Sequence, residues 1–294
     1  MTESNCRLPI DDCGIAGENP QSAVVARATL SVVIIAKNEE HRISRCLESV
    51  RWADEIVVVD GCSTDPTVEI CRAHGARVVS HAFVGDFSIE RNLGLEAASG
   101  EWVLQLDADD VVTDGFRRRV FQMLAHDDPA CDAYKFRRHS VLLGQPMRYG
   151  GWLHYIPNLV RRRTVRFTGR VHERPVVPGQ IGVIEADIEH HPFHSVEEFR
   201  TRQQRYTALQ AQELLEQRGR LPAWRIRWQQ LRSTFKSFWK SYIKKQGFRE
   251  GRNGLRFAVL FAWVEWLKWR KYSELIRRDR ETEKQRGREN ATKR

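Results

Sequence analysis

The sequence has no apolar run long enough to cross a lipid bilayer. Its longest uninterrupted run, residues 257–264, falls far short of the roughly 20 residues that a spanning helix requires. The first residues include acidic side chains and no apolar core, so we expect no secretory signal. Any membrane association is therefore expected at the bilayer surface, and the protein is expected to be cytoplasmic.

Cysteine pairs and phosphate-binding glycine loops are also missing. The six cysteines form no CxxC pair and have no zinc-type spacing with histidine, which favours reduced thiols. No GxGxxG follows the first predicted strand and no GxxxxGKS/T occurs anywhere, which excludes the dinucleotide fingerprint and the P-loop. A bound phosphate group must be held in another way.

The composition is that of a folded protein with an uneven distribution of charge. Hydrophobic residues make up 41% of the 294 residues and charged residues 29%, which excludes disorder of the whole chain. Residues 1–195 carry a formal charge of −5, whereas residues 196–294 carry +15. A basic second part suggests phosphate-bearing partners, either nucleic acid or an anionic membrane surface.

Apolar runs alternate with helical patterns in the first part of the chain. Continuous apolar strands that alternate with helices predict an α/β fold with a mostly parallel sheet. The predicted strands are residues 30–36, 55–60, 77–80 and 101–107, and the predicted helices are residues 39–50, 65–71 and 88–98.

The pattern divides the chain into three parts. Residues 1–28 are polar without periodicity and are interpreted as a loose leader, residues 29–194 form the α/β domain, and residues 195–294 form a helical, basic region. Ser195 and Glu198 have capping-box spacing at the start of that region. The remaining predicted elements are a helix at 113–125, short strands within 131–190, and helices at 195–217, 222–246 and 251–280.

Polar clusters follow three of the predicted strands, at residues 36–40, 60–65 and 107–110. In an open parallel sheet, ligands bind beyond the carboxyl ends of the strands. Asp60 and Asp65 follow the second strand, where turn or cap roles are the alternative interpretation. Asp107 and Asp109 end the fourth strand, and two carboxylates so placed can converge on one divalent cation. Such a cation can bridge a diphosphate.

Three segments of the first part resemble the nucleotide-sugar domain of family 2 glycosyltransferases, which have the Rossmann-like GT-A fold. These segments are SVVIIAKNEE, EIVVVDGCSTD and ERNLGLEAASGEWVLQLDADD. Four later segments are similar to bacterial enzymes that add a β-linked hexose to the lipopolysaccharide inner core, and to related envelope glycosyltransferases. They are YGGW, LVRRR, FTGRVHERPVV and EHHPFHSVEEF. The resemblance implies hexose transfer from a nucleotide-sugar donor to a lipid-linked acceptor. Transfer to a polyprenyl phosphate or another envelope glycan is the alternative within that chemistry.

The resemblance also implies which residues hold the donor. Asp109 would be the principal ligand of Mg²⁺ or Mn²⁺, with Asp107 near the ribose and the metal. The second loop departs from the DSGSTDGT-like pattern of relatives, since Pro66 replaces a glycine there. The residues implied for the nucleotide are Ala36, Glu39, Asp60, Arg91, Asn92 and Asp107.

Inverting transfer requires a base that deprotonates the acceptor hydroxyl. We predict Glu173 for this role, because it follows a predicted bend at Gly169 and Arg170. The alternative is a surface ion pair between Glu173 and Arg170 or Arg174. His190 or His191 is a further candidate metal ligand, and a structural or exposed role for these adjacent histidines is the alternative.

The basic region, residues 195–294, is expected to dock on the anionic lipid surface at the inner face of the cytoplasmic membrane. Tryptophan favours the headgroup region and basic residues are attracted to anionic lipid. In the alternative, the apolar stripes pack against the sheet. Nucleic-acid binding is a second alternative, but the helices carry large apolar faces and no known nucleic-acid motif, so no nucleic-acid partner is expected. The tryptophans concerned are Trp224, Trp228, Trp239, Trp263, Trp266 and Trp269.

Overall fold

The computed structural model describes residues 27–169 and 173–292, which divide into two units. The first unit contains the described part of Met1–Ser140 together with His154–Pro192. The second contains Val141–Leu153 and the described part of Phe193–Arg294. Val141–Leu153 thus lies in the helical unit, although it precedes the predicted division at residue 195. The predicted leader, residues 1–28, lies almost entirely outside the described residues.

A nine-stranded sheet, counted over the described residues, has the order β3-β2-β1-β4-β8-β6-β11-β5, with β7 paired to β6. The first four strands are parallel to one another. The α/β fold with a mostly parallel sheet is therefore confirmed, with antiparallel pairs β4/β8 and β11/β5 added. The strands are β1 Leu30–Ala36, β2 Glu55–Asp60, β3 Arg77–Ser80, β4 Trp102–Asp107, β5 Asp110–Val112, β6 Cys131–Leu142, β7 Gln145–Pro146, β8 Leu153–Arg161 and β11 Gln180–His190, while β9 Arg166–Thr168 and β10 Arg174–Val176 pair separately.

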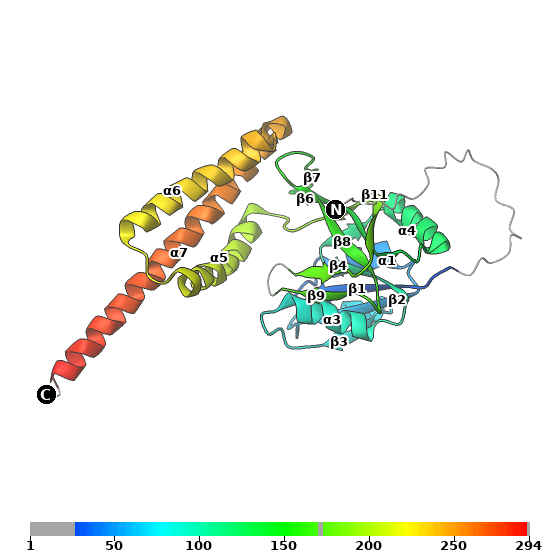
Figure 1. The fold of residues 1–294 in the computed structure, drawn as a ribbon, viewed down its shortest axis with the longest axis horizontal. Coiled ribbons are helices and arrows are strands. Elements are labelled where there is room, and N and C mark those ends of the chain that lie inside the picture. The colour runs from blue at the N-terminus through cyan, green and yellow to red at the C-terminus, as the bar shows by residue number, and fades with distance from the viewer. Residues whose placement is uncertain (1–26, 170–172, 293–294) are drawn as a thin grey trace, which may run out of the picture. The chain divides into compact units, whose positions relative to one another are not determined.

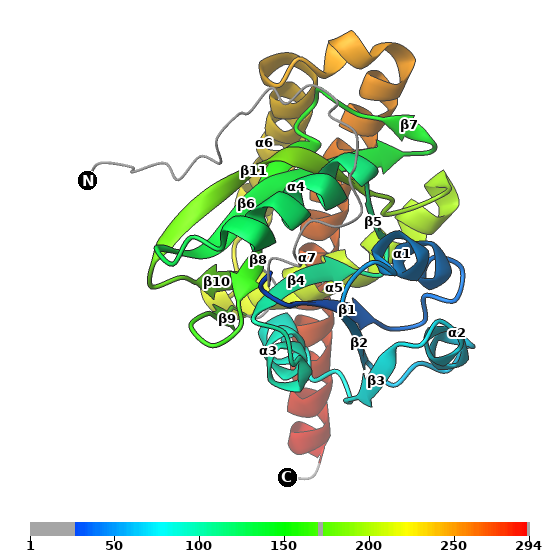
Figure 2. The ribbon, with the colours of Figure 1, turned by 90° about the vertical axis from the view of Figure 1, so that its right-hand side faces the viewer.

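Helices cover both faces of the parallel strands, as the continuous apolar strands require. Val32 and Ile34 of β1 pack in a core with α1, α2 and α4, whereas Val33 packs on the opposite face with α3. Figure 2 shows α3 on the other side of β1, β2 and β3 from α1 and α2. These helices are α1 Ile43–Val50, α2 Thr67–Ala73, α3 Phe87–Ala97 and α4 Asp114–His126.

The first helix begins later than the sequence predicts. It starts at Ile43 rather than at residue 39, and residues 40–42 form a turn in which the N–H of Arg42 donates to the carbonyl of Glu39 at 2.9 Å. The N–H of Glu39 donates to Thr67 Oγ1 at 2.8 Å, and that of Glu40 donates to Asp65 Oδ2 at 3.2 Å. Asp65 therefore ties the loop after β1 to the start of α2.

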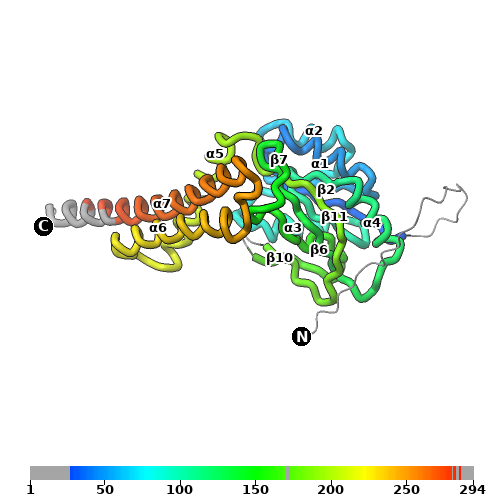
Figure 3. Tube along the Cα trace, turned by 90° about the horizontal axis from the view of Figure 1, so that it is seen from above, coloured from blue at the N-terminus to red at the C-terminus, as the bar shows by residue number. Residues whose placement is uncertain are grey.

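The second unit is built from three helices. Ser195 caps α5 as predicted, since its Oγ accepts the N–H of Glu198 at 3.0 Å. Helices α5 and α6 both pack against α7, and α6 and α7 run side by side in Figures 1 and 3. Among the described residues, no helix is both long and apolar enough to span a membrane. The helices are α5 Val196–Arg218, α6 Ala223–Trp239 continued by a π-helical turn Lys240–Lys244, a 3₁₀ turn Gly247–Glu250, and α7 Gly251–Thr292.

Gly94 allows α3 to approach the sheet closely. A Cβ atom at this position would overlap Cγ1 of Val33, whereas a Cβ atom at Gly115 in α4 would make only an ordinary contact with Thr113. We expect Gly94→Ala to lower the free energy of unfolding by about 1–3 kcal/mol through overpacking. Gly115→Ala should be neutral or stabilising, because alanine favours helix. Urea unfolding of both variants measures the difference, and equal stabilities would contradict the close approach.

Candidate active site

Strand register brings the carboxyl ends of β2 and β4 to either side of β1. Ala36 lies beside Asp60, and Ile35 lies beside Asp107. Ala36 and Asp60 are buried, and Asp107 is largely buried. The residues predicted from separate segments therefore meet at one edge of the sheet, where a ligand of an open α/β sheet binds.

The loops after β1 and β2 are linked by side-chain hydrogen bonds. Asn38 Oδ1 accepts the N–H of Thr64 at 2.8 Å, and Ser63 Oγ accepts the N–H of Asn38 at 2.9 Å. The carboxylate of Asp60 accepts the N–H of Ser63 at 3.1 Å and its hydroxyl at 2.5 Å. Asp60 thus holds its own loop, as in the alternative interpretation, while it borders the site. Glu39 forms an ion pair with Arg42 at 2.6 Å.

Arg91 joins two of the predicted site residues. Its Nε donates to Glu173 Oε1 at 2.8 Å, and its Nη2 donates to Asp107 Oδ1 at 2.8 Å. Burial lowers the pKa of this guanidinium, but the negative charges of Asp107 and Glu173 outweigh burial, so the pKa is raised overall. Glu173 thus forms an ion pair with Arg91, which lies 82 residues away in the chain. The predicted base is thereby brought next to the acidic end of β4.

Asn92 anchors the strand that leads toward Glu173. Its Nδ2 donates to the carbonyl of Phe167 at 2.9 Å, and its Oδ1 accepts the N–H of Phe167 at 2.9 Å. This exchange fixes β9 against α3. Residues 170–172, which include Arg170, lie outside the described residues, and the described chain resumes at Glu173.

Arg138 lies among the carboxylates that follow β4. Its Nη2 is 2.6 Å from Asp107 Oδ2, 2.7 Å from Asp110 Oδ1 and 3.5 Å from Asp109 Oδ1. Burial raises the pKa of Asp107, but Arg138 and Arg91 outweigh this and lower it to about 2. Both cations therefore hold Asp107 in its charged form.

Asp109, Asp110 and His190 form a group that fits a divalent cation. One ligand atom from each lies within 4.8 Å of the others. His190 Nδ1 is 3.1 Å from Asp109 Oδ1 and from Asp110 Oδ1. Burial lowers the pKa of His190, but chiefly Asp109 raises it to about 9, so the imidazole is protonated at neutral pH. Two carboxylates and one imidazole are suitable donors for Mn²⁺, which would replace positive charge that His190 and Arg138 now supply.

The sequence did not reveal the roles of Arg138 and Asp110. Asp110 was visible beside Asp109, but it is β11 that brings His190 to both of them. Arg138 stands next to Arg137 within β6, and only the strand's orientation decides that Arg138 faces the acids while Arg137 pairs with Asp187. Asp109 of the predicted metal pair belongs to this group, while Asp107, the other predicted ligand, forms ion pairs with Arg91 and Arg138.

Comparison with known proteins gives the family. The sequence profile described as "Glycosyl transferase family 2" matches residues 31–192, which is more than half of the chain. The chain belongs to this family. It is therefore a glycosyltransferase, and its mostly parallel sheet is that of the GT-A fold.

Relatives of this glycosyltransferase include proteins from several bacteria. The chain is 26% identical to an uncharacterized glycosyltransferase of Rickettsia typhi, over 85% of this chain and 89% of the relative. A Staphylococcus aureus TarS structure with UDP-GlcNAc is 17% identical, with a TM-score of 0.42 over 86% of this chain and 92% of TarS. Glucosyl-3-phosphoglycerate synthase from Mycobacterium tuberculosis, solved with Mn²⁺ and UDP-glucose, is 28% identical, with a TM-score of 0.34 over 38% of this chain and 44% of the synthase.

The position of Arg138 leads to a prediction for the glycosyltransferase. Arg138→Met removes a cation that three neighbouring carboxylates share, which we expect to cost about 3–5 kcal/mol in metal-free protein. Mn²⁺ should restore much of this loss by supplying positive charge. Arg137→Met is the matched control, because Arg137 pairs with the partly exposed Asp187.

Thermal unfolding with EDTA and with Mn²⁺ measures both variants. Arg138→Met should have the lower midpoint in EDTA and the larger gain with Mn²⁺. Equal losses in the two variants, or an equal response to Mn²⁺, would contradict the charge arrangement.

Proposed function

We propose that the protein transfers a hexose from a nucleotide-sugar donor to a lipid-linked acceptor of the lipopolysaccharide-core type. The observation that carries the proposal is the acidic group at the end of β4, within a domain of family 2 glycosyltransferases. The acceptor class rests on the resemblance of the later segments, including FTGRVHERPVV. A polyprenyl phosphate is the alternative acceptor. The enzyme would work at the cytoplasmic face of the membrane, on whose anionic surface it would rest.

The donor would bind beyond the carboxyl ends of β1, β2 and β4. Ala36 and Asp60 would border the nucleoside, and Arg91 would fix Asp107 beside it. Asp109 would hold Mg²⁺ or Mn²⁺ together with Asp110 and His190. The bound ion would neutralise the charge that develops on the leaving diphosphate.

Glu173 would act as the base of an inverting displacement. Its carboxylate accepts a bond from Arg91, which also binds Asp107, so the base is held beside the donor site. The proton of the acceptor hydroxyl would pass to Glu173 while the hydroxyl oxygen attacks the anomeric carbon. The bond from that carbon to the diphosphate would break, and its electron pair would leave with the diphosphate. One displacement inverts the anomeric configuration.

A donor screen tests the reaction. Purified protein is incubated with a panel of nucleotide sugars and Mn²⁺, and the release of nucleoside diphosphate is recorded with and without lipid-linked core saccharide or polyprenyl phosphate. We expect one donor to be hydrolysed slowly and its sugar to be transferred to the core saccharide. Turnover of no donor when membranes are supplied would refute the proposal.

Asp109→Asn tests the role of the acidic group in the same assay. Loss of a ligand that stabilises the leaving group should lower turnover by at least about a hundredfold. Asp114→Asn is the control, because Asp114 is exposed in the first turn of α4 and pairs only weakly with Arg117. Full activity in EDTA, or equal activity of the two variants, would contradict a metal at this site.

Glu173→Gln separates catalysis from donor binding. A base acts only in the transition state, so turnover should fall about 10²–10⁴-fold with little change in donor affinity. Glu185→Gln, an exposed substitution on β11, serves as the control. Donor affinity is measured by calorimetry and folding by thermal unfolding. A loss confined to donor affinity would reassign Glu173 to the nucleotide pocket.

A further inference from the structure

Helix α6 exposes its largest apolar side chains. They recur at steps of four and three residues, so they form one stripe along the helix. Isolated exposed apolar residues are common, but a continuous stripe of five marks an interaction surface. The members of this exposed stripe and their exposed fractions are Trp224 (65%), Trp228 (62%), Leu231 (68%), Phe235 (65%) and Trp239 (51%).

The opposite face of α6, not the stripe, packs against α7. Ile226 is its buried apolar residue, and Gln230 Nε2 donates to the carbonyl of Trp266 at 3.0 Å. Ser233 and Ser237 follow on the same face and are partly buried. The usual arrangement of an amphipathic helix is therefore reversed, since small and polar residues face the neighbouring helix. Packing within this unit does not account for the exposed stripe.

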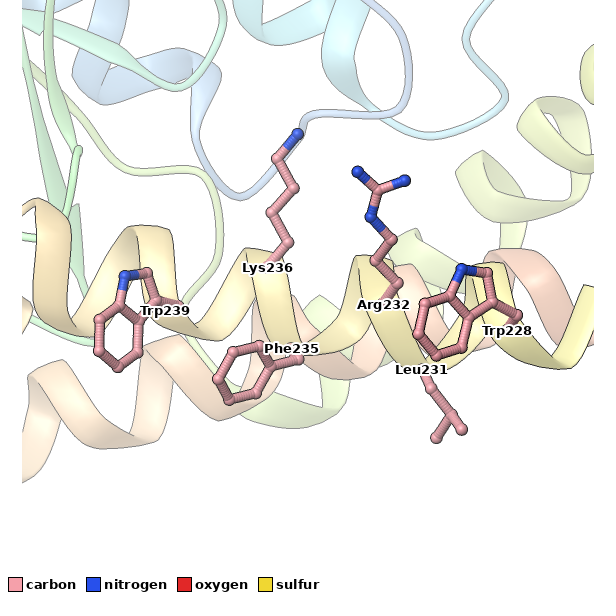
Figure 4. A pocket seen from close by; sticks show the side chains of 6 residues that line it. All are labelled: Trp228, Leu231, Arg232, Phe235, Lys236 and Trp239. Atoms are coloured by element: carbon pink, nitrogen blue, oxygen red, sulfur yellow. The ribbon is translucent and has the colours of Figure 1, made fainter.

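Basic side chains border the exposed stripe. In Figure 4, Arg232 and Lys236 extend to one side of α6, Leu231 and Phe235 point to the other, and Trp228 and Trp239 lie toward the two ends of this row. Residues 223–246 contain no acidic residue at all, but they carry seven lysines and arginines: Arg225, Arg227, Arg232, Lys236, Lys240, Lys244 and Lys245. The surface is therefore both apolar and strongly cationic.

This combination determines the kind of partner. A second copy of the chain would bring two cationic stripes together without acids between them, which is unfavourable. Nucleic acid would satisfy the charge, but it offers no apolar layer for Leu231 and Phe235. An anionic bilayer satisfies both, because tryptophan and basic residues favour the headgroups while leucine and phenylalanine enter the acyl boundary.

We propose that α6 lies in the plane of an anionic membrane surface with its exposed stripe inserted and its basic residues among the headgroups. The biological reason for this docking rests on the proposed function, because a lipid-linked acceptor would be presented at such a membrane surface. The proposal narrows the docking region predicted from the six tryptophans. Trp269 of α7 is only 4% exposed and Trp263 packs against the core of the helical unit, whereas Trp266 is 36% exposed, less than any member of the stripe.

Flotation of the full chain with vesicles tests this docking. Phosphatidylcholine vesicles with phosphatidylglycerol should bind the protein, binding should weaken with salt, and pure phosphatidylcholine should bind less. The variant Trp228→Ser, Leu231→Ser, Phe235→Ser should lose at least about a hundredfold in partitioning, because three large side chains no longer enter the lipid. These side chains are exposed, so the variant should unfold at the wild-type temperature.

The matched control replaces three other exposed apolar residues of the helical unit. Leu209→Ser, Leu255→Ser and Val259→Ser remove side chains of α5 and α7 that are 45–62% exposed. This control should float like the wild type. Equal losses in both variants, or no binding of the intact protein to anionic vesicles, would overturn the proposal.

Two further measurements identify other occupants and separate this proposal from the proposed function. If light scattering shows a dimer that the stripe variant no longer forms, the membrane proposal is overturned. Tighter binding of DNA than of vesicles would overturn it as well. Donor hydrolysis in solution should be unchanged in the stripe variant. Flotation without hydrolysis of any donor would reject the proposed function alone, and hydrolysis without flotation would reject the docking alone.

Discussion

Buried Arg91 and the largely buried Arg138 hold together carboxylates that would otherwise repel one another. Arg91 from α3 and Arg138 from β6 both bind Asp107, and they extend from there to Glu173 and Asp110. Such a buried network is stable only when every charge has a partner. The end of β4, the interior of β6, the middle of α3 and the residue before β10 are therefore held together by charge.

The same network prepares the site for its chemistry. In the proposed function, carboxylates that are already charged and oriented would hold the metal ion, and the ion would bind the diphosphate, as in preorganised sites that stabilise developing charge. Arg138 and His190 supply positive charge beside Asp109 and Asp110. Arg91, Arg138 and His190 thus offset most of the negative charge of the four carboxylates before any ligand binds.

The helical unit distributes its apolar residues differently. Its cores are built largely by α5 and α7, for example by Phe199, Phe257 and Tyr272, whereas α6 contributes Ile226. The similarity to the Rickettsia typhi protein covers 85% of this chain, which extends beyond the residues that the family profile matches. The helical unit is therefore shared at least in part with that relative.

The sequence by itself determined the parallel sheet, the cap at Ser195 and the position of Asp107 and Asp109 at a strand end, because these follow from local periodicity and local hydrogen bonding. It also showed the periodic apolar residues of α6. Only the tertiary structure decided that Arg138 rather than Arg137 faces the acids, that Glu173 meets Arg91, and that the large side chains of α6 face away from α7. Those choices depend on strand register and on which helix face finds a neighbour, and both bring together residues that are far apart in the chain.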